Sequence, residues 1–319
     1  MLIHPVRASP SIVDVSISGF AFNPQNLTIL RGDTVVWNNT DQVVYTLWFV
    51  HLANESTYLV SEPIIPGTTF THTFNDEVHL QYFSLERLWI AGFLTVIQDS
   101  TPPTTVHDYD GLWHTSDFTI LLSATDDISG VAETYYKIND ASTQNVSTHG
   151  QPLIAIESAN NTLEYWSVDH TANEEFPHKI LSGIKLDKTA PTIEEPTHHP
   201  EGDITPDQSV IVTVNITDAT SGVKNTTLSY TTDNGTSWID LPMTHNSTSG
   251  LHQTIIPEHP YCTWVRHKII AYDNAENPTV KDNSGEYYVY HVVPEFPAVM
   301  ILPLLMLFTL TAIAHAKKD

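Results

Sequence analysis

Aspartates in two recurring turn motifs are the side chains of this sequence best placed to do chemistry. They are Asp126, Asp127, Asp169, Asp218 and Asp273. Carboxylates are hard oxygen ligands that suit calcium, but calcium takes about six to eight oxygens and neither motif forms a dense acidic loop. We therefore expect these aspartates to cap turns, because Asp accepts hydrogen bonds from nearby backbone amides. Calcium binding is the alternative.

Histidine and cysteine give no pattern of a metal or catalytic site. The spacing of His51, His72 and His79 matches no ligand motif, and the other histidines are scattered. Cys262 is the only cysteine, which excludes an intrachain disulfide and a cysteine-based zinc or redox site. No nucleophile elbow, phosphate-binding glycine loop or H-E-x-x-H motif is found. The sequence thus predicts no enzyme and no cofactor.

Three segments near the N-terminus occur in an order that is typical of one family. Residues 19–24 read GFAFNP, residues 32–41 read GDTVVWNNTD, and residues 66–74 read PGTTFTHTF. This order resembles the plastocyanin/amicyanin type of cupredoxin across residues 12–98. The resemblance implies a Greek-key β-sandwich, and the alternation over residues 13–18 predicts one of its strands.

The resemblance also locates the positions of a copper site. In that family one early histidine and a late C-x-x-H-x-x-M run hold copper, because a thiolate and two imidazoles make a suitable electron-transfer centre. The matching positions here are Tyr45, Ser84, Arg87 and Ile90, and residues 12–98 contain no Cys or Met. We predict a cupredoxin-like scaffold without copper. Copper binding with electron transfer is the alternative that the resemblance implies.

Aromatic residues are frequent in the two segments that would flank the former copper site. They are Tyr45, Trp48, Phe49, Tyr82, Phe83 and Trp89. Several are expected to pack in the core, and Tyr45, Trp48 and Trp89 are predicted to form a binding surface. Exposed aromatic rings could grip a glycan or a protein partner.

The middle of the chain contains an internal repeat with an offset of 92 residues. Alternating apolar residues at 118–124 lead into TDDISGV at 125–131, and those at 210–216 lead into TDATSGV at 217–223. A second motif recurs in the same order, with Asp169 and Asn173 matching Asp273 and Asn277. These copies resemble the Ig-like or fibronectin-III-like modules of prokaryotic surface proteins.

Proline-rich joints and these motifs predict an all-β chain of tandem β-sandwiches with a C-terminal transmembrane helix. The expected division is a lead at 1–11, the cupredoxin-like domain at 12–100, Ig-like repeats at 101–190 and 191–292, and an anchor at 293–319. Joints such as TPPT at 101–104 and TAPT at 189–192 extend the chain, as linkers between sandwiches require.

The C-terminus carries a stretch long enough to cross a bilayer. Residues 296–314 are uncharged, and about 20 apolar residues suffice for a spanning helix. Lys317 and Lys318 favour the cytoplasmic side, which places the rest of the chain outside the cell. Pro294, Glu295 and Phe296 form a PEF tripeptide that resembles the sorting signal of archaeal surface proteins. An uncleaved anchor is an equal alternative.

Nine N-x-S/T triplets agree with an extracytoplasmic location and are predicted glycosylation acceptors. They begin at Asn26, Asn38, Asn54, Asn145, Asn160, Asn215, Asn225, Asn234 and Asn246. Residues 1–10 lack an apolar core of a signal peptide, so we expect the true start to lie upstream or a leader to be missing. A tail-anchored cytosolic protein is the minor alternative.

The charge balance limits the classes of partner. The chain has 13 Lys and Arg against 37 Asp and Glu, a formal net charge of −24, and so no basic patch to bind nucleic acid. We predict a single-pass cell-surface or envelope protein that acts in adhesion, surface-layer structure or recognition of a protein or glycan. A calcium-stiffened adhesin is a further alternative.

Overall fold

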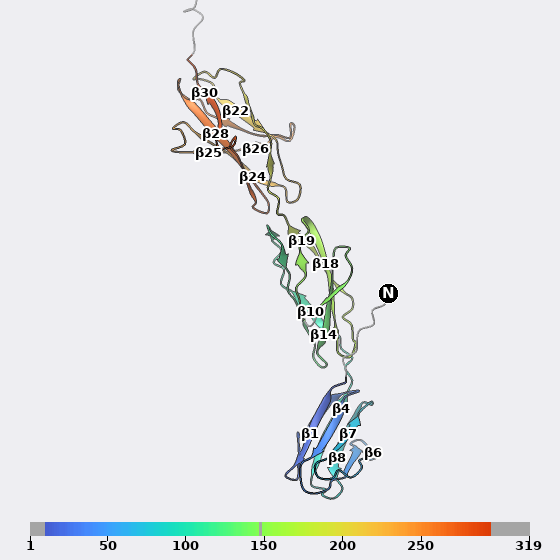
Figure 1. Ribbon diagram of the computed structural model, residues 1–319. Helices are drawn as coiled ribbons and strands as arrows, with labels where there is room; N and C mark the ends of the chain where they lie inside the picture. Colours follow the sequence, from blue (N-terminus) through green and yellow to red (C-terminus); the bar gives the residue numbers. More distant parts are fainter. Residues whose placement is uncertain (1–9, 147–148, 295–319) are drawn as a thin grey trace, which may run out of the picture. The chain divides into compact units, whose positions relative to one another are not determined.

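A computed structural model describes residues 10–146 and 149–294 of the 319-residue chain. Every regular element in this part is a β-strand, which confirms the all-β prediction for these residues (Figure 1). No helix in the described ranges has the length and apolar character needed to span a membrane. The predicted anchor at 296–314, with Glu295, Phe296, Lys317 and Lys318, lies outside the described residues.

The chain divides into two compact units. Unit 1 consists of Met1–Tyr109, Thr119–Pro152 and Thr162–Leu181, and unit 2 of Asp110–Phe118, Leu153–Asn161 and Ser182–Asp319. Strands of residues 101–190 therefore belong to both units, and the predicted division into three modules stays a prediction.

Nine strands of unit 1 form two sheets. They are β1 (Ile12–Ser18), β2 (Ala21–Asn23), β3 (Asn26–Leu30), β4 (Thr34–Asn39), β5 (Leu47–His51), β6 (Thr57–Val60), β7 (Thr69–Thr73), β8 (Val78–Ser84) and β9 (Ala91–Ile97). One sheet has the order β2-β1-β4-β7 and the other the order β3-β9-β8-β5-β6. The pairs β1/β4 and β3/β9 are parallel, and the pairs β4/β7, β5/β8 and β8/β9 are antiparallel.

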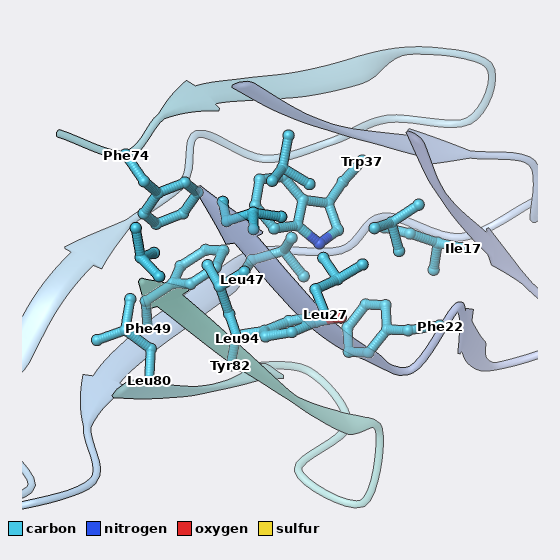
Figure 2. Close-up of a cluster of buried hydrophobic side chains, with 14 of the residues drawn as sticks. Ile17, Phe22, Leu27, Trp37, Leu47, Phe49, Phe74, Leu80, Tyr82 and Leu94 are labelled. Atoms are coloured by element: carbon cyan, nitrogen blue, oxygen red, sulfur yellow. The ribbon is translucent and has the colours of Figure 1, made fainter. Parts of the chain in front are cut away.

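Aromatic rings fill the core between these sheets (Figure 2). The side chain of Trp37 is fully buried, and its ring centroid lies 5.1 Å from that of Phe49, 5.8 Å from that of Tyr82 and 6.2 Å from that of Phe74. Side chains on one face of a strand recur at every second residue, so alternating apolar positions produce one continuous core. The strand predicted at 13–18 is confirmed.

The next ten strands are short except for β14, β18 and β19. They are β10 (Thr104–His107), β11 (Trp113–His114), β12 (Phe118–Thr119), β13 (Leu122–Thr125), β14 (Val131–Ile138), β15 (Gln144–Val146), β16 (His149–Gly150), β17 (Leu153–Ile154), β18 (Ser158–Asp169) and β19 (Lys179–Leu186). Their sheets have the orders β10-β13-β16, β11-β19-β18-β14-β15 and β12-β17.

The remaining strands of unit 2 form two larger sheets and one small pair. The strands are β20 (Thr192–Ile193), β21 (Thr197–His199), β22 (Val210–Val214), β23 (Ile216–Thr217), β24 (Val223–Thr231), β25 (Ile239–Pro242), β26 (Thr244–His245), β27 (His252–Ile256), β28 (Trp264–Asp273), β29 (Pro278–Lys281) and β30 (Tyr288–His291). One larger sheet has the order β21-β22-β27-β26, and the other the order β25-β24-β28-β29 with β30 also paired to β28. As the sequence predicts, Val210, Val212, Val214 and Ile216 are buried in a common core.

The sequence repeat extends to details of the backbone. The β14/β18 ladder has a bulge between Val131 and Glu133, and the β24/β28 ladder has one between Val223 and Asn225, at the same offset of 92 residues. The strand before each T-D motif pairs in the same way, β10 with β13 and β20 with β23. A bulge bends a strand and redirects nearby side chains. Because each bulge directly follows the T-D motif, we expect the side chains of the motif to have the same orientation in both copies.

Candidate functional site

Hydrogen bonds join several loops at one end of the N-terminal sandwich. The backbone amides of Gly19 and Phe20 donate to the carboxylate of Asp41 at 2.7 and 3.0 Å. The amide of Leu85 donates to the carbonyl of Thr46 at 2.8 Å, which links the loop before β5 to the loop after β8. These bonds gather the loops 19–20, 40–46 and 85–90 into one surface.

The four predicted copper positions meet at this end, and none offers a copper ligand of the usual kind. Tyr45 and Ser84 are fully buried and Ile90 is nearly so. The Tyr45 hydroxyl donates to Asp41 Oδ2 at 2.6 Å, and the Ser84 hydroxyl donates to Glu86 Oε2 at 2.9 Å. The Arg87 guanidinium carbon lies 5.8 Å from the centre of the Tyr45 ring.

This set of donors does not fit a type 1 copper centre. Such a centre needs a thiolate and two imidazoles, whereas both hydroxyls here are engaged with carboxylates and the fourth position is a hydrocarbon. Arg87 has a permanently protonated guanidinium with no lone pair to offer a metal cation. The side chains of Tyr45 and Ser84 instead form hydrogen bonds at this end of the sandwich.

The pKa values of the groups at this end reflect the same hydrogen bonds. The hydrogen bond from Tyr45 is the main reason why the pKa of Asp41 lies below its usual value, and Arg87 adds to the effect. Burial, followed by the bond to Asp41, raises the pKa of Tyr45 to about 12. Burial alone would raise the pKa of Glu86, but hydrogen bonds from Thr46 and Ser84 outweigh it and lower that pKa.

The predicted aromatic binding surface needs a correction. The side chain of Tyr45 is fully buried and its hydroxyl donates to Asp41, so this ring is not available to contact a partner. Trp48 is half-buried against Phe83, with ring centroids 5.1 Å apart, and its indole N–H donates to Thr57 Oγ1. Trp89 alone of the three is open to solvent, with 76% of its surface exposed.

Exposed aliphatic and aromatic side chains accompany Trp89 on the joined loops. They are Phe20, Val44, Leu85 and Leu88, together with Ile65 in the segment that pairs with Tyr45. We call these five residues and Trp89 the apolar end. Arg87 lies 5.1 Å from the Phe20 ring centre, so a cation is set among these apolar groups. Exposed apolar groups that gather at one place mark interaction sites more often than scattered ones do.

A second arrangement of functional interest consists of two clusters of three aspartates. Asp99, Asp126 and Asp169 form the first cluster. Asp187, Asp218 and Asp273 form the second. In each, one carboxylate oxygen from every residue lies within 4.8 Å of the others. Among the described residues, these are the two groups of three or more ligating side chains that could hold a metal ion.

The linker aspartates Asp99 and Asp187 were not among the sequence candidates. Each follows the last strand of one sandwich-like region and lies far along the chain from its two partners. One sequence signal could have identified them. Both aspartates precede a Thr-Pro or Thr-Ala-Pro joint, and both lie the same number of residues before the first residue of the next strand. Asp127, which was a candidate, lies outside the cluster and accepts a hydrogen bond from Thr101 Oγ1 at 2.7 Å.

The nine predicted glycosylation acceptors lie at accessible positions. Asn215 and Asn246 are half-buried. The others are exposed, namely Asn26, Asn38, Asn54, Asn145, Asn160, Asn225 and Asn234. Accessibility is a requirement for glycan attachment, and glycosylation itself stays a prediction.

Comparisons with known proteins bear on separate parts of the chain. Residues 185–305 match a family model described as a domain of unknown function, DUF7743, which covers less than half of the chain. No curated protein matches.

Cupredoxins are among the solved structures that are similar to part of this chain. A purple cupredoxin from Nitrosopumilus maritimus is 26% identical, covers 27% of this chain and 99% of its own, and has a TM-score of 0.25. A Cu(I) form of an amicyanin mutant is 20% identical, covers 27% of this chain and 83% of its own, also with a TM-score of 0.25. A reduced amicyanin mutant is 19% identical, covers 29% of this chain and 95% of its own, and has the same TM-score of 0.25. Scores this low carry no argument about function.

Proposed function

We propose that this chain is a non-enzymatic, membrane-anchored protein of the cell surface or envelope, and that its cupredoxin-like domain recognises a protein or glycan partner. The β-sandwich repeats that follow, which resemble Ig-like modules, would display that domain above a C-terminal membrane helix. The acidic composition, the accessible sequons and the uncharged stretch at 296–314 support a surface location.

Two features carry the proposal: the positions of the expected copper ligands hold buried, hydrogen-bonded residues, and the apolar end lies beside them. Tyr45 and Ser84 are buried and hydrogen-bonded where ligands would be needed, while Trp89 and Leu88 project into solvent on the same loop. Large exposed apolar side chains cost solubility unless they contact something, and Trp is the residue most enriched among the energetic centres of interfaces.

Copper loading tests the first half of the proposal. The purified chain, incubated with copper and then desalted, is expected to retain no stoichiometric copper by elemental analysis. It should also show neither the intense visible band nor the EPR spectrum of a type 1 centre, because no thiolate is present in residues 12–98. Stoichiometric copper with such a spectrum would favour the electron-transfer alternative instead.

Partner binding tests the second half. The probe is the binding of the purified chain to isolated envelope fragments of the source cells. Trp89→Ala is expected to weaken this binding about tenfold or more, which corresponds to roughly 1.4 kcal/mol, because it removes the most exposed ring of the apolar end.

Phe176→Ala provides a matched control, since Phe176 is 83% exposed but lies outside the apolar end. Its binding should equal that of the wild type. Equal losses in both variants would point to general surface stickiness, and unchanged binding of Trp89→Ala would exclude recognition through this end.

A further inference from the structure

We propose that each of the two aspartate clusters binds one hard divalent cation, with calcium the best match. The ion would fasten the end of one sandwich-like region to the loops of the repeat that follows. This inference concerns a site other than the apolar end and does not depend on partner recognition.

Buried charge is the first argument. Asp99 and Asp169 are each 2% exposed, and Asp187 and Asp273 are fully buried. Within residues 10–146 and 149–294, none of the six carboxylates forms an ion pair with a lysine or arginine. Ionised carboxylates within a few ångströms of each other repel, and removing them from water is costly unless an opposite charge is present.

An unsatisfied oxygen in the first cluster is the second and independent argument. Asp126 Oδ1 accepts hydrogen bonds from the amides of Gly130 at 2.6 Å and Ile128 at 3.2 Å. The other oxygen, Oδ2, is buried and has no hydrogen-bond donor. A buried carboxylate oxygen without a partner is rare and destabilising. A cation within the cluster would satisfy it.

The same bonding recurs in the second copy. The linker carboxylates Asp99 and Asp187 each accept a hydrogen bond through Oδ2, from the amides of Ser129 and Ser221, at 2.9 and 3.0 Å. Likewise, the Asn173 side-chain amide donates to the backbone carbonyl of Asp99 at 3.2 Å. In the second copy, Asn277 donates to the carbonyl of Asp187 at 3.0 Å.

These bonds leave part of the acceptor capacity of each cluster unused. Asp126 Oδ1, Asp169 Oδ1 and Asp218 Oδ1 each accept two backbone amides, so these atoms are occupied. In contrast, Asp126 Oδ2 has no donor, and the Oδ2 atoms of Asp99 and Asp187 each accept one amide, which leaves a second acceptor direction for a cation. Hydrogen bonds of this kind to metal ligands fix the geometry of a site.

The donor set selects the class of ion. Each of the three carboxylates offers one hard oxygen, and no histidine or cysteine belongs to either cluster, which disfavours zinc and copper. Calcium accepts about six to eight oxygens in a flexible arrangement that water can complete, whereas magnesium demands near-ideal octahedral geometry. Known extracellular calcium modules have dissociation constants of about 10⁻⁴ to 10⁻³ M, so we expect binding in the millimolar range.

Calcium titration of the full chain after removal of metal with EDTA tests the inference. The wild type is expected to bind two calcium ions. Asp126→Asn and Asp218→Asn should each bind one ion fewer, and the double variant none. Asparagine keeps the oxygen that accepts the amide bonds but replaces its partner with an NH₂ group, which cannot ligate a cation.

Asp127→Asn is the matched control. Asp127 is the exposed neighbour of Asp126 in the same loop, and Ala219 stands at its position in the second copy. This variant should still bind two ions. If the wild type binds no calcium at millimolar concentrations, or if Asp126→Asn retains both ions, the inference is wrong.

Thermal unfolding separates a metal site from a purely structural network. Calcium should raise the melting temperature of the wild type, because it binds the folded state alone. In EDTA, Asp126→Asn should melt no lower than the wild type, since it removes a repelling charge, and calcium should raise its melting temperature less. A variant that melts lower in EDTA, with an undiminished response to calcium, would show that the carboxylates serve only as hydrogen-bond acceptors.

Discussion

Replacing Gly92 with alanine is expected to lower the free energy of unfolding of the N-terminal sandwich by about 3 kcal/mol or more. A Cβ atom at this position in β9 would lie 2.1 Å from the backbone oxygen of Gln25 and 2.7 Å from the Tyr82 ring. Neither neighbour can move aside freely. The Tyr82 hydroxyl donates to that same oxygen at 2.9 Å, and Tyr82 is fully buried in the core.

Gly67→Ala is the control for this experiment, because it changes a glycine of the same sandwich without a clash. Gly67 has φ +79°, and a Cβ atom added there would meet nothing within 4 Å, so only backbone strain of about 1 kcal/mol is expected. Urea unfolding followed by tryptophan fluorescence would compare the two variants with the wild type. If Gly92→Ala and Gly67→Ala lowered the free energy of unfolding by the same amount, the close approach of β9 to Gln25 and Tyr82 would be contradicted.

Lowering the pH from about 6.5 to about 4 is expected to remove roughly 3 kcal/mol of stability from unit 2 through His267. This histidine of β28 is 3% exposed. Burial, and secondly the nearby His198, lower its pKa from 6.5 to about 4. Because the pKa in the folded state lies below that in the unfolded state, folding favours the neutral ring. The contribution is complete above the unfolded pKa and is lost as the pH falls toward the folded one.

His267→Gln separates this contribution from that of the many carboxylates that also titrate at low pH. The neutral glutamine changes the stability at every pH by the same amount, so the comparison is between the losses from pH 7 to pH 4.5 in each protein. The variant should lose less free energy of unfolding over this interval than the wild type. If the two losses are equal, the buried imidazole is not a source of the acid sensitivity.

Alternation of apolar residues was sufficient to predict much of the fold. The pattern at Val210, Val212 and Val214 indicates directly which face of the strand is buried, because side chains on one face recur at every second residue. The internal repeat was equally accessible, since its bulges and turns require particular residues. Gly130 and Gly222 both have φ +80°, a conformation that other residues rarely adopt.

Loop residues were harder to predict. Tyr45 lies between strands, where no alternation indicates which way a side chain points. Its ring is buried and its hydroxyl bonds to Asp41 in a loop whose conformation the sequence pattern does not predict. The aspartate clusters were missed in part for a related reason. Asp99 meets Asp126 and Asp169 only after two loops distant in sequence have been brought together, so no local density of acidic residues marks the site.

The turn of the second motif contains a backbone conformation that is unusual for its residues. Ala172 and Glu276, which precede the final asparagine of the two D-x-x-x-N turns, have φ +70° and +71°. The left-handed conformation that glycine would favour is therefore required in both copies. The side chain of the final asparagine, which bonds to the aspartate of the same turn at 2.7 and 2.8 Å, helps to hold it.

The position of Asp99 and Asp187 has a consequence for how such chains evolve. Each repeat carries two of the three carboxylates within its own loops and takes the third from whatever strand precedes it. A duplicated repeat thus needs only one aspartate at the end of the preceding region to form the same aspartate cluster. A repeat can therefore be added to or removed from such a chain without the selection of a new interface, and any domain that ends in a strand and an aspartate can precede it.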